Sequence, residues 1–222
     1  MDLTIHPTIC SLIPDFKIGM ITYSGIQVSD SPQMLKGRLQ MFQESIFFDL
    51  ESKNVTDFPG IDEWRGIFKK IGKDPNRYRH SAEALYRRVK KNNFVPSVHS
   101  ATDLNNFFSL QYRVPIGIYD LDKLSGTIEM RIGATGEVYE GLNGRENSLE
   151  HLLITADESG PFGTPFVDSQ RSAVTVETTN ALQIVYLRPS LTSEESTKLI
   201  ESLMNMFTQI HGGESQFQVK GC

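Results

Sequence analysis

The most chemically distinctive part of the sequence is a run of basic residues between Arg65 and Lys91. This segment holds ten lysines and arginines and two acidic residues, a formal charge of +8, and because the whole chain carries −5 the remainder carries −13. Cationic side chains neutralise nucleic-acid phosphates, and the interleaved Tyr78 and Tyr86 can stack on unpaired bases. The predicted RNA-binding residues are Arg77, Arg79, Arg87, Arg88, Lys90 and Lys91. The alternative is a solvated helix face whose bases pair with acidic residues elsewhere in the chain.

A second group of polar residues lies in the segment TPFVDSQR, residues 164–171. The Arg171 guanidinium can form a forked pair with a carboxylate, and the Asp168 carboxylate can accept an ammonium group. Such a pair suits a pocket for an amino-acid-like small molecule. An internal ion pair that only braces a long loop would give the same pattern. The predicted pocket residues are Thr164, Asp168, Ser169, Arg171 and Asn106.

Other kinds of site have no matching pattern in the sequence. The five histidines are scattered without metal-ligand spacing, and there is no phosphate loop, dinucleotide fingerprint or Ser/His/Asp order. We therefore expect neither a metal nor a cofactor, and no catalytic residue is identified. Cys10 and Cys222 lie near opposite ends of the chain without CxxC or zinc spacing, which predicts two incidental thiols rather than a disulfide.

The hydrophobic residues argue against a membrane protein. They make up 39% of the chain, and no apolar run approaches the ~20 residues that cross a bilayer. Asp2 stands where a signal peptide would carry positive charge, and Pro7 and Pro14 interrupt the residues that follow. We expect a cytoplasmic protein without a membrane partner.

The elements that must position these side chains begin with strands and continue with helices. Residues 3–9 and 16–28 are rich in β-branched and aromatic residues and predict strands. The Ser31-Pro32 pair predicts the start of a helix. Two further helices are predicted, one from Ser81 and one capped by Thr102-Asp103.

The second half of the chain has a different pattern of residues. Short β-like runs separated by turn residues fill residues 114–187, and a final amphipathic helix is predicted from Thr192. The tail after Gly213 is expected to be loose. Strands and helices come in blocks without βαβ alternation, which predicts an α+β fold in one domain spanning residues 1–222.

Several motifs, in order along the chain, resemble the B3/B4 region of the bacterial phenylalanyl-tRNA synthetase β subunit. They are RRV at 87–89, DLNNF at 103–107, PIGIYDLD at 115–122, Arg131, LNGRE at 142–146 and VTVETTNALQIVYL at 174–187. The flanking segments resemble stand-alone B3/B4 proteins. The resemblance implies one B3/B4-like domain with a mixed, largely antiparallel sheet flanked by helices. Its best-matching core is residues 85–187, with residues 1–58 and the helix at 192–211 packed on it.

In the synthetase this domain carries an editing pocket that hydrolyses mischarged tyrosyl-tRNA. The position of the family's editing His is Gly117 here, and that of the editing Glu is close to Ile184, with Val185 beside it. Glycine and an aliphatic side chain can neither accept a water proton nor hold an oxyanion. The resemblance therefore implies an RNA-associated protein that binds tRNA or aminoacyl-tRNA and does not aminoacylate.

Two alternatives belong to other functional classes. The chain could be a freestanding hydrolase of misacylated tRNA, with Asp168, Ser169, Arg171 or a bound water replacing the lost groups. It could also be a small-molecule binding protein that keeps an amino-acid pocket without the tRNA.

Overall fold

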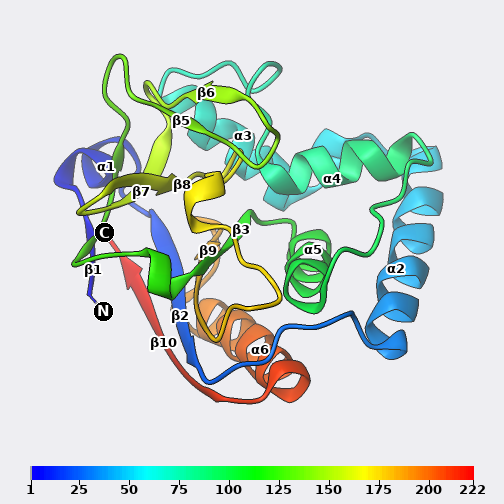
Figure 1. Ribbon diagram of the computed structural model, residues 1–222. Coiled ribbons are helices and arrows are strands. Elements are labelled where there is room, and N and C mark those ends of the chain that lie inside the picture. The colour runs from blue at the N-terminus through cyan, green and yellow to red at the C-terminus, as the bar shows by residue number, and fades with distance from the viewer. Residues whose placement is uncertain (1) are drawn as a thin grey trace.

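Two four-stranded β-sheets form the centre of the computed structural model, which describes residues 2–222 (Figure 1). In the first sheet the strand order is β1-β4-β7-β8, with β1 parallel to β4 and the other pairs antiparallel. The second sheet, β10-β2-β9-β3, is antiparallel throughout. The strands are β1 (Leu3–Ile5), β2 (Lys17–Ser24), β3 (Ile116–Asp120), β4 (Ile128–Ile132), β7 (Leu153–Asp157), β8 (Gly160–Gly163), β9 (Asn180–Tyr186) and β10 (Glu214–Gly221). A hairpin of β5 (Val138–Glu140) and β6 (Glu146–Ser148) stands apart.

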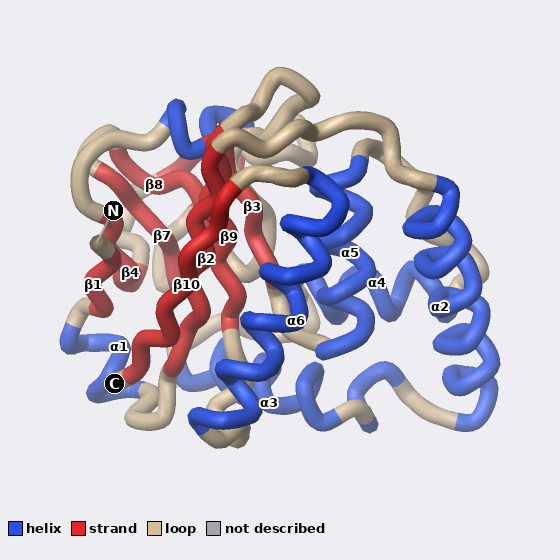
Figure 2. Tube along the Cα trace, turned by 90° about the horizontal axis from the view of Figure 1, so that it is seen from below, coloured by secondary structure: helices blue, strands red, loops and turns tan. Residues whose placement is uncertain are grey.

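The α-helices lie mainly on one side of the strands. Figure 2 shows α2, α4, α5 and α6 beside the second sheet, with α2 at the outer edge of the molecule. The helices are α1 (Pro7–Leu12), α2 (Gln33–Ser52), α3 (Pro59–Lys70), α4 (Ser81–Lys90), α5 (Ser100–Tyr112) and α6 (Ser193–His211). This arrangement confirms the α+β class and the mixed, largely antiparallel pairing, although the strands divide between two sheets. Within residues 2–222, no helix is both long and apolar enough to cross a membrane.

Three clusters of buried side chains hold these elements together. The first lies between the two sheets and includes Trp64, whose Nε1 donates to the Tyr186 carbonyl oxygen at 3.1 Å. The second packs α5 and α6 against the second sheet, where Tyr23 stacks on Phe207. The third joins α2 to α4 and α5. Burial of this apolar surface is the main favourable term that fixes the cavity walls described below.

Histidines cap two of the helices that position the predicted site residues. His80 precedes α4 and its Nδ1 accepts from the Glu83 amide at 3.3 Å, while His99 precedes α5 and accepts from the Thr102 amide at 3.3 Å. An imidazole nitrogen thus satisfies one of the free N–H groups at each helix start, as an N-cap residue does. The helix predicted from Ser81 is confirmed, with the cap one residue earlier.

The predicted Thr102-Asp103 cap is wrong. Asp103 lies in the first turn of α5 and is fully buried, and it accepts hydrogen bonds from Ser31 Oγ at 2.5 Å, Val98 N at 2.9 Å and Ser97 Oγ. Ser31 is therefore engaged with Asp103 and does not cap α2, whose first residue is Gln33. The buried carboxylate ties two loops to the start of α5, because each hydrogen bond offsets the cost of removing its charge from water.

The C-terminal tail differs from its prediction. Residues after Gly213 form β10, which pairs along its whole length with β2 and brings the two chain ends together. Cys10 and Cys222 are joined by a disulfide with a Cα–Cα distance of 5.3 Å, so the expectation of two thiols is also wrong. The Cys222 amide donates to Phe16 O at 2.9 Å beside it. Spacing along the chain could not indicate this pair, because strand pairing alone makes the two ends neighbours.

Candidate functional site

A cavity of about 740 Å³ opens between α5, β3 and the loop that follows β8. Its walls come from segments far apart in the sequence, which the fold brings together. Apolar side chains make up most of the lining, a composition typical of small-molecule sites. The lining residues are Ser81, Val98, His99, Thr102, Asn105, Asn106, Ile116, Ile118, Leu142, Phe166, Val167, Asp168, Ala173, Val174, Thr175 and Val176.

The mouth of this cavity carries exposed aliphatic side chains. Val98, Leu142 and Val176 are among the exposed large hydrophobic residues of the chain, and all three line the cavity. They come from the loop before α5, the β5–β6 connection and the segment before β9. Grouped exposed apolar residues mark binding surfaces more often than single scattered ones do. The rim therefore favours a ligand with an apolar part.

One wall of the cavity is polar and belongs to α5. Asn105 and Asn106 both line it. The Asn105 Oδ1 accepts a hydrogen bond from Gln183 Nε2. The Oε1 of Gln183 in turn accepts from the Tyr23 hydroxyl at 2.8 Å. Because Gln183 occupies the Asn105 oxygen, Asn105 offers its N–H donors to the cavity. At the end of this wall, burial lowers the pKa of His99, so its imidazole is neutral near pH 7.

Asp168 supplies the one acidic group of the cavity lining. Its Oδ1 accepts from the Tyr119 hydroxyl at 2.8 Å and from the Thr164 amide at 3.2 Å. Burial raises the pKa of Asp168 to about 7, and the two hydrogen bonds offset only part of that effect. A carboxyl that titrates near neutrality can hold or release a proton under physiological conditions.

The positions that the resemblance assigns to the editing His and Glu lie on the other face of β3. Gly117 pairs with Ile184 across β3 and β9, while Ile116 and Ile118 point into the cavity. Successive residues of a strand face opposite sides, so position 117 faces Tyr119. A Cβ at 117 would overlap the Tyr119 hydroxyl. The Tyr119 side chain therefore fills the space that a histidine there would need.

Further buried hydroxyl groups surround Tyr119 on that filled face. Tyr139 donates to the Val167 carbonyl oxygen, while Tyr186 Oη and Thr155 Oγ1 are buried without a hydrogen-bond partner within residues 2–222. Burial raises the pKa of Tyr119 and Tyr186 above the usual tyrosine range. These phenols stay protonated at neutral pH, and the hydrogen bond from Tyr119 to Asp168 links this face to the open cavity.

The predicted pocket residues divide between the cavity and its supports. Asn106 and Asp168 line the cavity together. Thr164 is buried and braces the loop, its hydroxyl donating to Val167 O at 2.7 Å, and Ser169 caps the short 3₁₀ helix Gln170–Ser172. Arg171 lies outside the cavity, on a hollow of about 520 Å³ lined also by Ser169.

Arg171 forms the internal ion pair that was the alternative to a ligand site, with Asp157 rather than Asp168 as its partner. Its guanidinium contacts both carboxylate oxygens of Asp157, at 2.8 and 3.2 Å, and donates to Gly160 O at 2.8 Å. Burial alone would raise the pKa of Asp157, but the Arg171 pair and two backbone donors lower it. The forked geometry expected for a ligand carboxylate is thus used within the protein.

Sequence reasoning missed Asn105, Tyr119 and Phe166. Asn105 is adjacent to the predicted Asn106, and Tyr119 and Phe166 read as ordinary core aromatics. The one available signal was strand alternation in residues 116–119, which places Tyr119 on the same face as Gly117. That alternation says which face a side chain takes, but not what packs against it.

The predicted basic surface is interrupted by an internal ion pair. Glu83 is fully buried in α4, and its Oε1 lies 2.8 Å from both Arg65 Nη1 and Arg87 Nε. Arg87 is therefore bound to the fold rather than presented free to phosphate. Tyr86 is buried as well, with its hydroxyl on the Leu110 carbonyl oxygen, so it cannot stack on a base.

The other basic residues form two groups at opposite ends of α4. Arg88, Lys90 and Lys91 are exposed at its C-terminal end, where Lys90 donates to the Lys53 carbonyl oxygen. Arg77 and Arg79 are exposed just before its start. A helix of this length separates the groups by about 15 Å.

The group before α4 is connected to the cavity. Arg77 lies over the Tyr78 ring, and that ring packs edge-on against Phe166, a cavity-lining residue, at 5.8 Å between centroids. The Ser81 amide donates to Pro165 O at 2.8 Å in the same region. Positive charge and the cavity mouth are therefore adjacent here.

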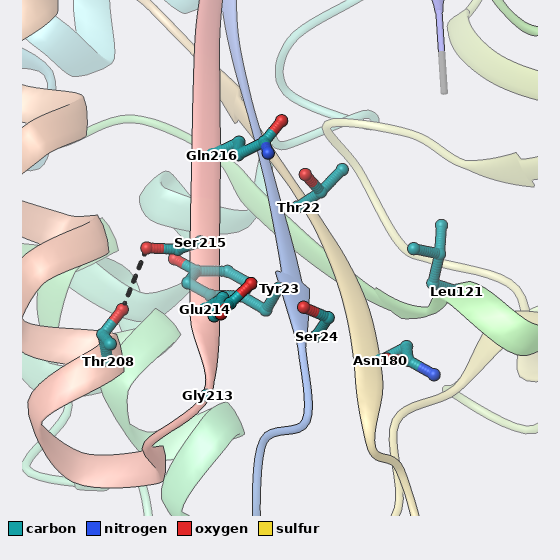
Figure 3. Close-up of a pocket in the computed structure, with 10 residues that line it drawn as sticks. All are labelled: Thr22, Tyr23, Ser24, Leu121, Asn180, Thr208, Gly213, Glu214, Ser215 and Gln216. Atoms are coloured by element: carbon teal, nitrogen blue, oxygen red, sulfur yellow. Dashed lines mark hydrogen bonds between the residues drawn. The ribbon is translucent and has the colours of Figure 1, made fainter.

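Figure 3 shows a second hollow, of about 600 Å³, over β10, β2 and the start of β9. Its lining is polar and nearly uncharged, with Thr208 Oγ1 hydrogen-bonded to Ser215 Oγ at 3.2 Å and Asn180 at the far side. None of the predicted site residues contributes to it. Within residues 2–222 no group of three His, Cys, Asp or Glu side chains could hold a metal ion.

Similarity to known sequences identifies the family of the chain. The sequence model of the B3/4 domain family matches residues 63–204, so the chain belongs to the B3/4 domain family. The chain is 33% identical over 213 residues to the uncharacterized protein YhzB of Bacillus subtilis (strain 168), with 96% of each chain covered.

In sequence, synthetase subunits match a shorter part of the chain. The phenylalanine–tRNA ligase β subunit of Bifidobacterium longum is 35% identical over 116 residues, which is 51% of this chain and 13% of that subunit. An N-terminal fragment of the phenylalanyl-tRNA synthetase β subunit from Pyrococcus horikoshii aligns over 96% of this chain and 50% of its own, with a TM-score of 0.49 and 14% identity.

Proposed function

We propose that this B3/4 domain protein binds aminoacyl-tRNA, with the amino acid in the 740 Å³ cavity and the RNA against Arg77 and Arg79. The observation that carries the proposal is the charge of the cavity wall: it offers one carboxyl, two amides and apolar surface, and no lysine or arginine. This combination fits an amino acid whose carboxyl group is esterified.

A free amino acid and its ester differ in what they require of the cavity wall. In both, the ammonium group can meet Asp168, and the side chain can fill the apolar part of the cavity. A free amino acid also brings a carboxylate, which needs a cationic partner when it leaves water. An ester brings only a carbonyl oxygen, for which the N–H donors of Asn105 and Asn106 suffice. Arg171, the group predicted to hold a carboxylate, is engaged with Asp157.

Exposed basic side chains near the cavity give the RNA a place to bind. Arg77 and Arg79 are exposed on either side of Tyr78 in the sequence, and the Tyr78 ring contacts Phe166 of the cavity wall. A tRNA whose acylated end enters the cavity would carry its last phosphates past these side chains. Each phosphate neutralised steepens the salt dependence of binding by about 0.7–0.9 in log–log slope.

A hydrolase is the second candidate function, and the raised pKa of Asp168 favours it. A carboxyl with a pKa of about 7 could accept a proton from water as the water oxygen attacks the ester carbonyl carbon. The ester C–O bond would then break, and the proton would pass to the departing ribose oxygen. The Asn105 and Asn106 amides would face the developing oxyanion.

The test compares charged and uncharged tRNA. Binding of the purified protein to a panel of aminoacylated tRNAs and to the same tRNAs deacylated is measured across a salt series. We expect tighter binding of at least one charged tRNA, and loss of that preference in Asp168→Asn and Asn106→Ala. Equal affinity for charged and uncharged forms would overturn the proposal.

Two controls accompany this test. Lys198→Glu changes one exposed charge on α6 and should leave binding unchanged. Release of amino acid in the same reactions is followed separately: turnover that Asp168→Asn abolishes supports the hydrolase, and binding without turnover supports the binding protein.

A further inference from the structure

The outward face of α2 carries a row of exposed apolar side chains. Met34, Met41 and Phe48 are 55%, 71% and 65% exposed, and each lies seven residues from the next. The inward face of the same helix is buried through Leu35, Leu39, Gln43, Ile46 and Leu50. Figures 1 and 2 show α2 at the edge of the molecule, with its outward face uncovered by other elements.

The seven-residue spacing places these side chains in one stripe. Single exposed hydrophobic residues are ordinary on protein surfaces, but a stripe with a seven-residue repeat is the pattern by which one helix packs on another. An amphipathic helix that only covers its own core needs one apolar face. The second face of α2 therefore has no role within the chain.

A hollow of about 310 Å³ lies directly on this stripe. It is lined by Arg38, Met41, Phe42 and Ser45, with Phe107 of α5 as its floor. The four α2 residues stand at positions i, i+3, i+4 and i+7, which is the set that surrounds a hole for a side chain of a facing helix. The surface is thus already shaped for one inserted side chain.

The charges of α2 indicate which helix fits. The N-terminal half of the helix carries Lys36 and Arg38, and the C-terminal half carries Glu44, Asp49 and Glu51. A second α2 laid antiparallel brings each basic half onto an acidic half. With the two-fold axis at Met41, Met34 faces Phe48 of the second copy, and Arg38 lies level with Glu44 of the second copy, across the width of the stripe.

The same axis explains the hollow. Met41 of each copy lies over the hollow of the other, because the four residues around that hollow are centred next to position 41. Gly37 and Ser45 of the second copy lie level with each other on either edge of the stripe, and both are small enough to let the backbones approach. A two-fold axis requires one surface patch to fit itself, and every pairing along this stripe meets that requirement.

We propose that α2 is the interface of a homodimer in which two copies of the chain pack antiparallel through Met34, Met41 and Phe48. The helix has 20 residues and spans about 30 Å, so the interface is at the small end of those that hold complexes together. The dimer is therefore reversible and depends on concentration.

Sedimentation velocity or light scattering of the purified chain over a concentration series tests the proposal. We expect the mass to rise from one chain to two, and Met41→Lys to weaken association on the order of 30-fold or more, since it buries an unpaired charge at the axis. Glu201→Lys, an exposed position on α6 away from α2, is the control and should dimerise as the unchanged chain does.

A charge exchange separates a second copy from other partners. Arg38→Glu should weaken the dimer, and Arg38→Glu with Glu44→Arg should restore it, because the exchange keeps one basic and one acidic residue at the same level of the two helices. Met41→Cys should cross-link to itself on oxidation, whereas Phe48→Cys should cross-link only when mixed with Met34→Cys. A chain that stays monomeric at every concentration, or self-cross-linking at position 48, would overturn the antiparallel dimer.

Discussion

The two faces of β3 differ in what lies against them. On one face, Ile116 and Ile118 point into an open cavity with an exposed apolar rim. On the other, Gly117 faces the Tyr119 hydroxyl, and the space is filled by tyrosines and core residues. Asp168 touches both regions, since it lines the cavity and accepts from Tyr119.

This difference shows how one backbone can keep or lose a reaction. The resemblance to the synthetase domain places the editing His and Glu at Gly117 and Ile184, which pair on the filled face. In this chain the side chains at these positions leave neither a base nor room for a substrate. Function therefore follows the side chains of the site rather than the fold, and the open face is where binding can take place.

The largest expected effect comes from restoring a histidine on the filled face. Gly117→His should lower the free energy of unfolding by about 3 kcal/mol or more, because the new side chain overlaps Tyr119 in a packed region. Chemical denaturation followed by circular dichroism measures this change.

The control for this substitution uses the residue that fills the space. In a Tyr119→Ala background, Gly117→His should cost much less than it does alone, since the two sites share one volume. A Gly117→His variant as stable as the unchanged chain would show that the space beside β3 is not filled.

The next effect concerns Asp168 and pH. Its pKa is raised from 3.8 to about 7 in the folded chain, so the unfolded state loses its proton first as pH rises. The stabilisation that the raised pKa of Asp168 gives to the folded chain is fully present below about pH 4 and is lost as pH rises through about 7. In the unchanged chain we expect the free energy of unfolding to fall by about 2 kcal/mol between these limits, a value that allows for partial exposure of the carboxyl. Asp168→Asn should remove this fall.

The comparison must be made between the variant and the unchanged chain at each pH. The buried His80 has a pKa lowered to about 3, so its contribution runs in the opposite direction and is lost as pH falls below about 6.5. The free energies of unfolding of both proteins, measured from pH 4 to 8, separate the contribution of Asp168 from that of His80. Parallel curves would mean that Asp168 titrates normally.

A smaller effect is expected from the amide wall of the cavity. Asn106→Ala should weaken binding of an amino-acid methyl ester about tenfold, the loss of one hydrogen bond in a partly dry site. Asn180→Ala, in the hollow of Figure 3, is the matched control and should leave ester affinity unchanged. Calorimetric titration measures the ester affinity of both variants. Equal losses of affinity would remove the distinction between the cavity and the hollow of Figure 3.

The smallest effect should come from the basic residues. Arg77→Glu with Arg79→Glu should reduce the salt dependence of tRNA binding by about 1.4–1.8 in log–log slope, the value for two phosphate contacts. Arg88→Glu with Lys91→Glu, at the other end of α4, should change it little. If the second pair has the larger effect, the RNA follows α4 rather than the cavity mouth.

Much of the fold could be predicted from local patterns. The α+β class, the helix from Ser81 and the helix from Thr192, whose capping box includes Glu195, all follow from signals within a few residues. Asp103 and β10 could not be predicted, because each depends on a distant partner. The Asp103 carboxylate is held by Ser31, and β10 exists because β2 is free to pair with it.

The candidate site was predicted only in part for the same reason. Asn106 and Asp168 both line one cavity, and their role in ligand binding stays a prediction. Arg171 faces away because Asp157, fourteen residues earlier, engages it across β7 and β8. Arg87 is occupied by the buried Glu83. Residue types indicated which chemistry was available, and the folded chain decided which groups were already paired.

The most direct test of this account is a titration of the purified chain with amino-acid methyl esters and with the matching free amino acids. The account predicts that at least one ester binds at least about tenfold more tightly than its free amino acid, and that Val174→Trp, which fills the cavity, abolishes that binding. Tighter binding of the free amino acids, or ester binding that survives Val174→Trp, would contradict it.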